Sequence, residues 1–287
     1  MKFSPLKIAA SLAILATSAS FAQTKAPEPD YTLSYNVGVV SDYRFRGISQ
    51  TSFKPALQLG VDFAHKSGFY LGAFGSNVDW VKEFNGATKG SYEIDLYGGY
   101  KGSITKDIGF DVGLITYLYP GNNSGVANAP KAIVAGQYSN ANTTEVYLGL
   151  TYSVVSFKYS RSMGNFLGNV GTNSTLIAGT GKSSGSQYFD LSANFDLGNG
   201  FTLTPHIGRQ TIPNQNSTNF FAPFQVINGN AANYTDYALT IAKDFGNGFV
   251  ASASAIGTDT KKGGFYRDSN GKELGKSTLV VGLKYNF

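Results

Sequence analysis

The hydrophobic and polar residues of this chain alternate with a period of two over most of its length. In the closing segment, Thr278 to Phe287, every second residue is apolar and the residues between are mixed or polar. This period places successive side chains on opposite faces of a β-strand. One face suits hydrocarbon and the other suits water, although a half-buried strand of a soluble sheet has the same pattern.

The alternation recurs often enough to predict about twelve strands. Strands of roughly nine to eleven residues can cross a bilayer when tilted, and single-chain bacterial barrels have an even number of strands. The predicted strands are Tyr31 to Ser41, Pro55 to His65, Phe69 to Val78, Tyr92 to Lys101, Ile108 to Tyr119, Glu145 to Tyr152, Val154 to Arg161, Gln187 to Leu197, Phe201 to Gln210, Asp236 to Phe245, Phe249 to Gly257 and Thr278 to Phe287.

The connections between these strands alternate between short and long. A soluble sandwich has no reason to keep its long loops at one end, whereas outer-membrane barrels have short periplasmic turns and long extracellular loops. The pattern therefore predicts an all-β, antiparallel transmembrane β-barrel with both termini on the periplasmic side. The short turns are Lys66 to Gly68, Gly102 to Asp107, Ser153, Gly198 to Gly200 and Gly246 to Gly248; the long loops are Asp42 to Lys54, Asp79 to Ser91, Pro120 to Thr144, Ser162 to Ser186, Thr211 to Thr235 and Thr258 to Ser277.

The amino-terminal residues have the features of an export signal. Lys2 and Lys7 precede the apolar run Ile8 to Leu15, and Ser20 and Ala22 supply small residues for cleavage. A run this short is below the roughly 20 residues of a membrane-spanning helix, so we expect it to be removed and the mature protein to reach the outer membrane. The predicted divisions are a signal peptide at 1–22, a periplasmic lead-in at 23–30 and a single barrel domain at 31–287.

The composition agrees with a strand-rich membrane protein and argues against several other classes. The 35 Gly, 18 Tyr and 21 Phe residues, against 14% charged residues, favour tight turns and aromatic belts over helices. The chain has no Cys, which excludes disulfides and thiolate metal sites. The net charge of +5 is small and the basic residues are scattered, so we expect no nucleic-acid partner.

Two segments carry a specific resemblance to a known family. They read SDYRFRGISQ at Ser41 to Gln50 and SGFYLGAFGSNVDW at Ser67 to Trp80, and the chain ends on an aromatic residue. In these segments the chain resembles the TorF-like family of outer-membrane porins from Gram-negative bacteria. The resemblance implies an outer-membrane barrel with a pore function, and it supplies no functional residues.

The first long loop begins with a charged and aromatic motif. We expect Arg44 and Arg46 to pair with Asp42, with Asp79 or with lipopolysaccharide phosphates, and so to hold the loop against the barrel. A ligand-binding or channel-lining role is the alternative. The motif consists of Asp42, Tyr43, Arg44, Phe45, Arg46 and Gly47.

The polar faces of the predicted strands supply candidates for lining a lumen. Acidic residues outnumber basic ones among them, and the sign of the lining charge sets the selectivity of a pore, so we expect a preference for cations or polar solutes. A closed interior in which these residues pair and fill space is the alternative. The candidates are Asp62, Glu93, Asp95, Asp111, Asp190 and Asp236 with Lys158, His206 and Lys284, and in addition Asp196 and Lys101.

Signs of catalysis are few, and we expect no enzymatic activity. The chain has only two histidines, His65 and His206, and lacks the His-Glu-x-x-His motif. A barrel phospholipase needs a Ser, His and Asn or Asp set, for which His206 would have to meet Ser192 or Asn194 on the adjacent strand. A lone strand histidine is more often structural. No cofactor or metal site is indicated.

The predicted function is a porin-like channel for passive diffusion of small polar solutes or ions. The alternatives are a plugged barrel whose long loops serve adhesion or surface architecture, and a barrel phospholipase. We expect the partners to be outer-membrane lipid and lipopolysaccharide, the solutes, and barrel-assembly machinery that recognises the terminal aromatic residue, Phe287.

Overall fold

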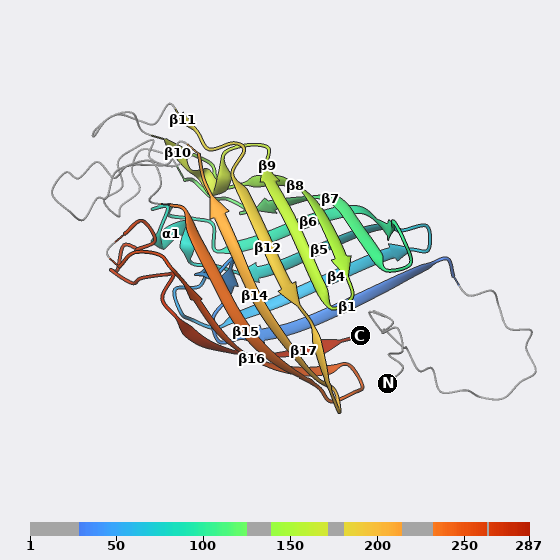
Figure 1. The fold of residues 1–287 in the computed structure, drawn as a ribbon. Coiled ribbons are helices and arrows are strands. Elements are labelled where there is room, and N and C mark those ends of the chain that lie inside the picture. Colours follow the sequence, from blue (N-terminus) through green and yellow to red (C-terminus); the bar gives the residue numbers. More distant parts are fainter. Residues whose placement is uncertain (1–28, 125–138, 172–180, 214–231, 263) are drawn as a thin grey trace, which may run out of the picture.

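Strands account for nearly all of the regular structure of the chain (Figure 1). The computed structural model describes residues 29–124, 139–171, 181–213, 232–262 and 264–287. The predicted signal peptide at 1–22 and most of the lead-in at 23–30 lie outside the described residues. No helix within the described residues is long and apolar enough to cross a membrane.

One large antiparallel sheet contains 13 strand segments. Two of these, β12 and β13, lie on either side of Asn194 and pair with the same neighbour, so they are one strand and the sheet has 12. The segments are β1 (Tyr31–Val40), β4 (Ala56–His65), β5 (Phe69–Asn77), β6 (Tyr92–Ser103), β7 (Ile108–Leu118), β8 (Thr143–Tyr152), β9 (Val155–Ser162), β12 (Gln187–Ala193), β13 (Phe195–Gly198), β14 (Phe201–Thr211), β15 (Tyr234–Asp244), β16 (Phe249–Thr258) and β17 (Thr278–Asn286).

The sheet closes because its first and last strands pair with each other. In the antiparallel register between β1 and β17, Val37 lies opposite Tyr285 and Val39 lies opposite Leu283. The Phe287 N–H also donates to the Tyr35 carbonyl at 2.9 Å. Closure leaves the sheet without an unpaired edge. The predicted closed, all-β, antiparallel 12-stranded barrel is confirmed.

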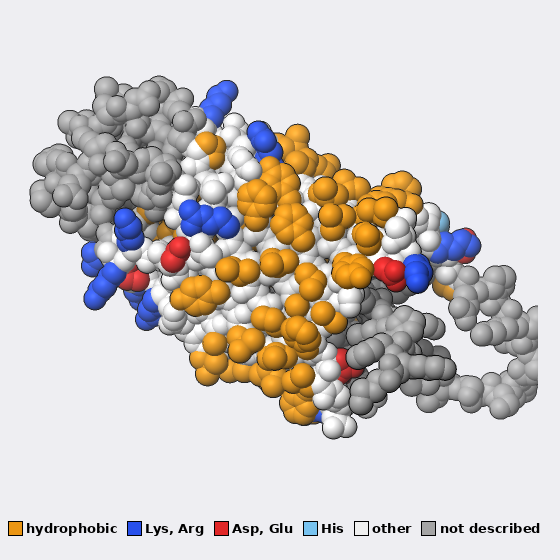
Figure 2. Space-filling model, viewed as in Figure 1, with side chains coloured by type: hydrophobic (Ala, Val, Ile, Leu, Met, Phe, Trp, Pro, Cys, Tyr) orange, Lys and Arg blue, Asp and Glu red, His pale blue; other side chains and the backbone are white. Residues whose placement is uncertain are grey.

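The two faces of the barrel wall carry different kinds of side chain. Outward-facing positions expose large apolar residues, which cover the barrel on the face shown in Figure 2. In β15, for example, Tyr237, Leu239 and Ile241 point outward, whereas Thr240 points inward and shares a hydrogen bond with Ser254 of β16. The exterior therefore suits hydrocarbon, and the interior suits water or packed polar groups.

The short turns lie at one end of the barrel, here called the short-turn end. In the Gly-Asn-Gly turn between β13 and β14, Asn199 has a φ of 51°, and Asn247 in the equivalent turn between β15 and β16 has a φ of 52°. Asn and Gly tolerate this left-handed backbone better than other residues, which explains why the same three residues recur. Aromatic pairs such as Phe245 with Phe249 flank these turns.

The opposite end, here called the long-loop end, contains short elements that the alternation pattern did not predict. They arise where the loops pack against one another instead of extending freely. These elements are β2 (Arg44–Phe45), β3 (Ile48–Ser49), α1 (Trp80–Glu83), the 3₁₀ turn η1 (Phe166–Gly168), β10 (Val170–Gly171) and β11 (Gly181–Lys182).

Some strand boundaries also differ from the prediction. β6 extends to Ser103, which shortens the turn predicted from Gly102, and β8 and β15 each begin two residues earlier than expected, at Thr143 and Tyr234. The ladder of backbone hydrogen bonds continues past the point where apolar alternation stops, because pairing needs no particular side chain at a strand end.

An outward-facing charge should destabilise the barrel when lipid surrounds it. Leu239 lies in the middle of β15 and is 51% exposed. We expect Leu239→Arg to lower the free energy of unfolding by about 2–4 kcal/mol, because arginine at the bilayer midplane is costly. Urea titration of the protein in lipid vesicles measures this difference.

The matched control is Thr240→Arg, which places the same side chain at the next position on the inward face. Its cost should be clearly smaller. Equal losses for the two variants would contradict a lipid-facing exterior.

Candidate functional site

The first long loop turns into the barrel as a tight hairpin formed by β2 and β3. Arg46 and Gly47 at its tip both have positive φ, 49° and 79°. A Cβ atom added at Gly47 would lie 2.7 Å from side-chain atoms of both Asp236 and Thr258, so only glycine fits where the hairpin tip meets the inner wall of β15 and β16. The hairpin is therefore built to lie inside the barrel.

Arg46 at the hairpin tip is fixed to two further strands of the barrel wall, β8 and β14. Its guanidinium pairs with Glu145 of β8 at 2.6 Å and donates to Gln210 of β14 at 2.7 Å. The group also lies over the Tyr188 ring at 4.2 Å. Burial lowers the pKa of Arg46, but Glu145, Tyr117 and Tyr188 together raise it by more, so the pKa lies above its ordinary value. Arg46 is a permanent buried cation that joins the hairpin to β8 and β14.

The base of the hairpin is held by Arg44 and Asp42. Arg44 Nε pairs with Asp42 at 2.6 Å, and the guanidinium also donates to the carbonyl of Leu274 in the last long loop. Ser49 and Thr51 donate to the same aspartate. Burial lowers the pKa of Arg44. These bonds connect the first long loop to the last.

The predicted pairing is therefore confirmed for one of the two arginines and wrong for the other. Arg44 pairs with Asp42, as expected, but Arg46 pairs with Glu145 instead of with Asp42, Asp79 or lipid phosphate. The prediction for Arg46 was wrong because the hairpin folds inward and not along the rim. Asp79 pairs with Lys54 instead, at 2.9 Å and at a partly exposed position.

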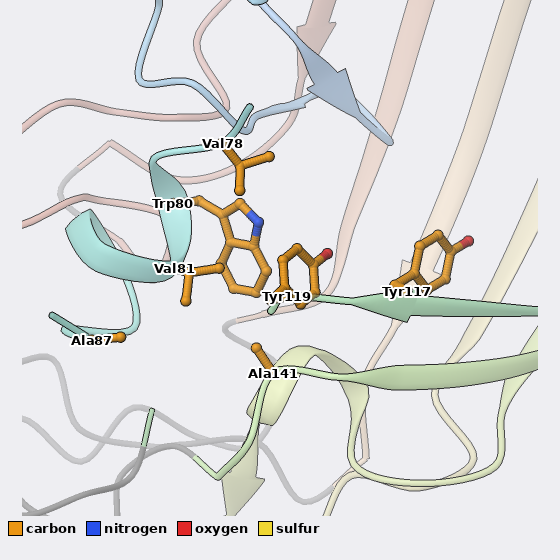
Figure 3. Close-up of a cluster of buried hydrophobic side chains, with 7 residues drawn as sticks. All are labelled: Val78, Trp80, Val81, Ala87, Tyr117, Tyr119 and Ala141. Atoms are coloured by element: carbon orange, nitrogen blue, oxygen red, sulfur yellow. The ribbon is translucent and has the colours of Figure 1, made fainter. Parts of the chain in front are cut away.

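Apolar residues of several loops pack above the hairpin and fill the long-loop end. In the cluster shown in Figure 3, Trp80 of α1 meets Tyr119 edge-on at 5.0 Å, with Val78 and Val81 beside it. Two further clusters of buried apolar residues continue this packing. Phe84, Phe45 and Tyr266 each pack against two of the three clusters and so connect them. A cavity of only about 40 Å³ remains among them, lined in part by the same residues.

The inward-facing wall is buried near the long loops and accessible near the short turns. Glu93, Asp95 and Asp236 are 1%, 6% and 2% exposed, and they lie in the long-loop half. Lys158 and Lys284, toward the short-turn end, are exposed although they share the inward face. The interior is thus a vestibule that opens at the short-turn end and ends below the hairpin.

The other lumen candidates lie along this vestibule or at its mouth. Asp62, Asp111, Asp190 and His206 are partly exposed, and Asp196 and Lys101 are exposed. Most are paired within the wall. Tyr97 donates to Asp62 and Tyr70 donates to Asp111, each at 2.5 Å, and Tyr70 also bonds to Tyr147, whose ring lies under Lys158 Nζ at 3.9 Å.

His206 joins two acidic residues of the inner wall. Its Nε2 lies 2.8 Å from Asp236, and its Nδ1 lies 3.1 Å from Ser192 Oγ and 3.5 Å from Asp190. The Ser192 hydroxyl donates to Asp190 at 2.8 Å, and Tyr188 donates to Asp236. The serine proton is thus directed to a carboxylate and not to His206.

Asn194, the alternative partner considered for His206, accepts a hydrogen bond from Thr204 at 2.8 Å instead. The group around His206 is best described as a network of ion pairs and hydrogen bonds that stabilises the wall.

The opposite part of the inner wall is neutral and lined by small residues. On β15, β16, β17 and β1 the inward-facing positions at mid-depth hold no charged side chain within the described residues. They are Ala238, Thr240, Ser252, Ser254, Gly282 and Gly38. At mid-depth the inward-facing charged groups are gathered on β4 to β14, whereas Asp236 of β15 and Lys284 of β17 lie nearer the two ends of the barrel.

Sequence analysis missed three residues that matter here, Glu145, Gln210 and Tyr188. Glu145 is fully buried and is the anchor of Arg46. The alternation along its strand would have placed Glu145 on the inward face, the same face as Tyr147. Glu145 was not chosen as a candidate because it stood at the first position of the predicted strand. Its partnership with a loop residue 99 positions away has no signal in one sequence.

No group of three or more His, Cys, Asp or Glu side chains among the described residues has a geometry that could hold a metal ion.

The comparison with the NanC porin supports the fold. The NanC porin matches with a TM-score of 0.50 and 10% identity, covering 89% of this chain and 99% of that one. The KdgM porin matches at 0.49 and 8%, covering 89% and 98%, and an outer membrane channel from Pseudomonas putida F1 matches at 0.47 and 12%, covering 94% and 99%. At these identities the likeness to NanC concerns the fold alone.

The search of curated proteins gave no match. The narrower resemblance to the TorF-like family is not confirmed and stays a prediction. Residues 24–287 match the model of the family described as "Bacterial protein of unknown function (Gcw_chp)", and the chain belongs to that family.

Proposed function

We propose that this protein is a porin-like channel of the outer membrane, through which small polar solutes or ions diffuse passively. The observation that carries the proposal is the closed barrel with an apolar exterior and a polar interior that is open to water at the short-turn end. Several charged residues of the interior, such as Asp62, Asp111 and Lys158, are partly or fully exposed, so water reaches them. In the conformation described, the hairpin closes the inner end of the vestibule.

The location and orientation follow from the same features. The predicted signal peptide supports export, and the short-turn end would face the periplasm, as in other outer-membrane barrels. The long-loop end would then face outward, next to lipopolysaccharide. The resemblance of Ser41 to Gln50 and Ser67 to Trp80 to TorF-like porins supports the same proposal.

Acidic residues are more numerous than basic ones in the interior, which favours cations or neutral polar solutes over anions. Along the vestibule, at its mouth and below the hairpin, the strands contribute eight carboxyl groups and only three lysines. These residues are Asp62, Glu93, Asp95, Asp111, Glu145, Asp190, Asp196 and Asp236 with Lys101, Lys158 and Lys284. Lining charge sets which ions enter a pore.

A plugged barrel with a role at the cell surface is the second candidate. The packing of the hairpin beneath three apolar clusters favours it, because the cavity described among these residues measures only about 40 Å³. A phospholipase is not proposed, since Ser192 and His206 face the interior and lie away from the lipid-facing surface.

Planar-bilayer recording with the purified protein separates these candidates, and Arg46→Ala sharpens the test. Removing Arg46 leaves Glu145 buried without its cation, which costs about 3–5 kcal/mol and weakens the attachment of the hairpin. We expect the variant to conduct at least tenfold more often than the unchanged protein.

Lys54→Ala is the matched control, because it removes an exposed ion pair of the same loop. Its conductance should be unchanged. Absence of unitary conductance in the unchanged protein and in Arg46→Ala, with both barrels folded, would favour the plugged barrel.

Ion selectivity provides a second test. The double variant Asp111→Asn with Asp190→Asn removes two vestibule carboxylates, so the preference for cations should fall and the reversal potential in a salt gradient should move toward zero. Asp107→Asn in an exposed short turn is the control. An unchanged reversal potential in the double variant would refute the assignment of these residues to the conducting path.

The terminal residue is expected to matter more for assembly than for stability. Phe287 is 57% exposed, and its ring contacts Tyr285 at 4.9 Å. Deleting Phe287 removes one hydrogen bond of the closed seam, a loss of about 1 kcal/mol, but also the group that assembly machinery would recognise. We expect several-fold less barrel in outer-membrane fractions, with near-normal refolding in detergent. Equal membrane levels of the two chains would contradict this role.

A further inference from the structure

The outer surface of the barrel has a groove where β15, β16 and β17 meet. Its volume is about 510 Å³, and it lies in the half of the wall nearest the long loops. We call it the outer groove. Its outward-facing lining residues are Tyr237 and Leu239 of β15, Ala255 of β16, and Ser277 and Leu279 at the start of β17. None of these side chains is charged.

Small residues of β16 form the floor of the outer groove. Ala255 lies opposite Leu239 on one side and Leu279 on the other, so a single methyl group stands between two leucines. At the next outward position toward the long loops is Gly257, where an added Cβ atom would lie 2.7 Å from the Tyr237 ring. The Tyr237 ring therefore lies across β16 and bounds the groove at its end nearest the long loops.

The protein leaves the outer groove open. Leu279 is 66% exposed and Leu239 is 51% exposed. Exposed apolar depressions mark places where a membrane or another molecule makes contact. On the outside of a transmembrane barrel, the neighbouring molecules are lipids, and an acyl chain is the apolar group that fits a long groove between strands.

The apolar surface ends directly above the outer groove, toward the long-loop end. The next outward residue after Tyr237 is Thr235 on β15, and the next after Ile207 is Arg209 on β14. The Arg209 guanidinium donates to the Thr235 hydroxyl at 3.1 Å, so it reaches from β14 across to β15. A lipid with its chain in the groove would have its headgroup at this level.

Basic residues predominate at the level of the headgroup. The described residues within four positions of the long-loop ends of β16 and β17 include three exposed lysines, Lys261, Lys262 and Lys276, and one acidic residue, Asp259. Asp259 forms only a loose pair with Arg209, at 3.8 Å between half-exposed groups. Figure 2 shows basic side chains along the long-loop edge of the apolar surface. An anionic headgroup complements this charge.

The cations differ in how far they are already engaged. Lys276 lies over the Phe53 ring at 4.4 Å. No ion pair within the described residues engages Lys261 or Lys262. Arginine binds phosphate through two parallel N–H groups, and lysines add positive charge. In the orientation proposed above, this end of the barrel lies in the outer leaflet, where the lipid A part of lipopolysaccharide carries phosphate groups close to its acyl chains.

We propose that the outer groove binds one lipid A unit of lipopolysaccharide, with an acyl chain along Ala255 and a phosphate held by Arg209, Lys261 and Lys262. The site rests on the outer-membrane orientation proposed above, but not on conduction. Arg209 belongs to β14, and the two lysines belong to the loop that follows β16. A bound phosphate would therefore attach the last long loop to the barrel wall.

Native mass spectrometry of the purified barrel in detergent, with lipid A added, tests the site directly. We expect one saturable lipid A adduct, and at least fivefold weaker binding of lipid A from which the phosphates have been removed. Ala255→Phe fills the groove, and the triple variant Arg209→Gln, Lys261→Gln and Lys262→Gln removes the charge. Each should weaken binding at least fivefold. If Ala255→Phe does not fold, Ala255→Leu replaces it.

Two matched controls separate this site from general lipid contact. Ala251→Phe places the same ring on the outward face of β16, but near the short turns, opposite Lys243 and Leu283. Arg161→Gln removes an exposed arginine from the outward face of β9, on the far side of β12 from β14. Both controls should bind lipid A like the unchanged protein.

Several results would overturn the site: no saturable adduct, equal losses in the controls and the groove variants, or equally tight binding of phosphatidylglycerol. A protein dimer that Ala255→Phe abolishes, without lipid A binding, would assign the groove to a second copy of the chain.

The orientation is tested separately. The chain has no Cys, so Lys89→Cys in the second long loop introduces a single thiol at an exposed position. A membrane-impermeant maleimide should label it in intact cells, and absence of labelling would refute the orientation. A barrel that binds lipid A but never conducts keeps the site and loses the channel.

Discussion

Every backbone polar group that faces hydrocarbon must find its hydrogen-bond partner within the protein, because lipid offers none. This constraint explains the closed ladder from β1 to β17 and the pairing of Tyr35 with the terminal residue Phe287. Once the sheet closes, each inward side chain is separated from lipid by the wall. The interior can then hold charges that the exterior cannot, and all the chemistry considered above depends on that separation.

The buried pair of Arg46 and Glu145 is costly to form and costly to disrupt. Both groups lose their hydration, and their attraction compensates only because the geometry is close and Gln210 and the Tyr188 ring add further contacts. An apolar pair of the same volume would fill the same space without the desolvation free energy of two charged groups. An ion pair here is consistent with a contact between the hairpin and the wall that is specific and can also break. The proposed channel requires such a contact, because the hairpin must leave the wall for the passage to open.

The strands could be predicted from the sequence almost to the residue, and the inward hairpin could not. Alternation along Tyr31–Val40 or Phe249–Thr258 is a local property that one chain displays directly. The direction in which a loop folds depends on partners far away, and Arg46 next to Asp42 in sequence gives no sign of Glu145. Likewise, parity placed Glu93 and Asp95 on the inner face, but only the packed structure shows that both are buried and that the loop residue Tyr43 donates to Glu93.

The contacts of the hairpin set the order in which this molecule can be completed. Arg44 near the start of the chain donates to carbonyl groups of Leu274 and Lys276, which are 230 and 232 residues away and directly precede the final strand. Long-range contacts of this kind form late, because the intervening chain must first be ordered. The hairpin can therefore adopt its final position only after the last long loop has folded. The β1–β17 seam joins residues at least as far apart, such as Asn36 and Asn286, so closure of the wall and closure of the passage belong to the same late stage.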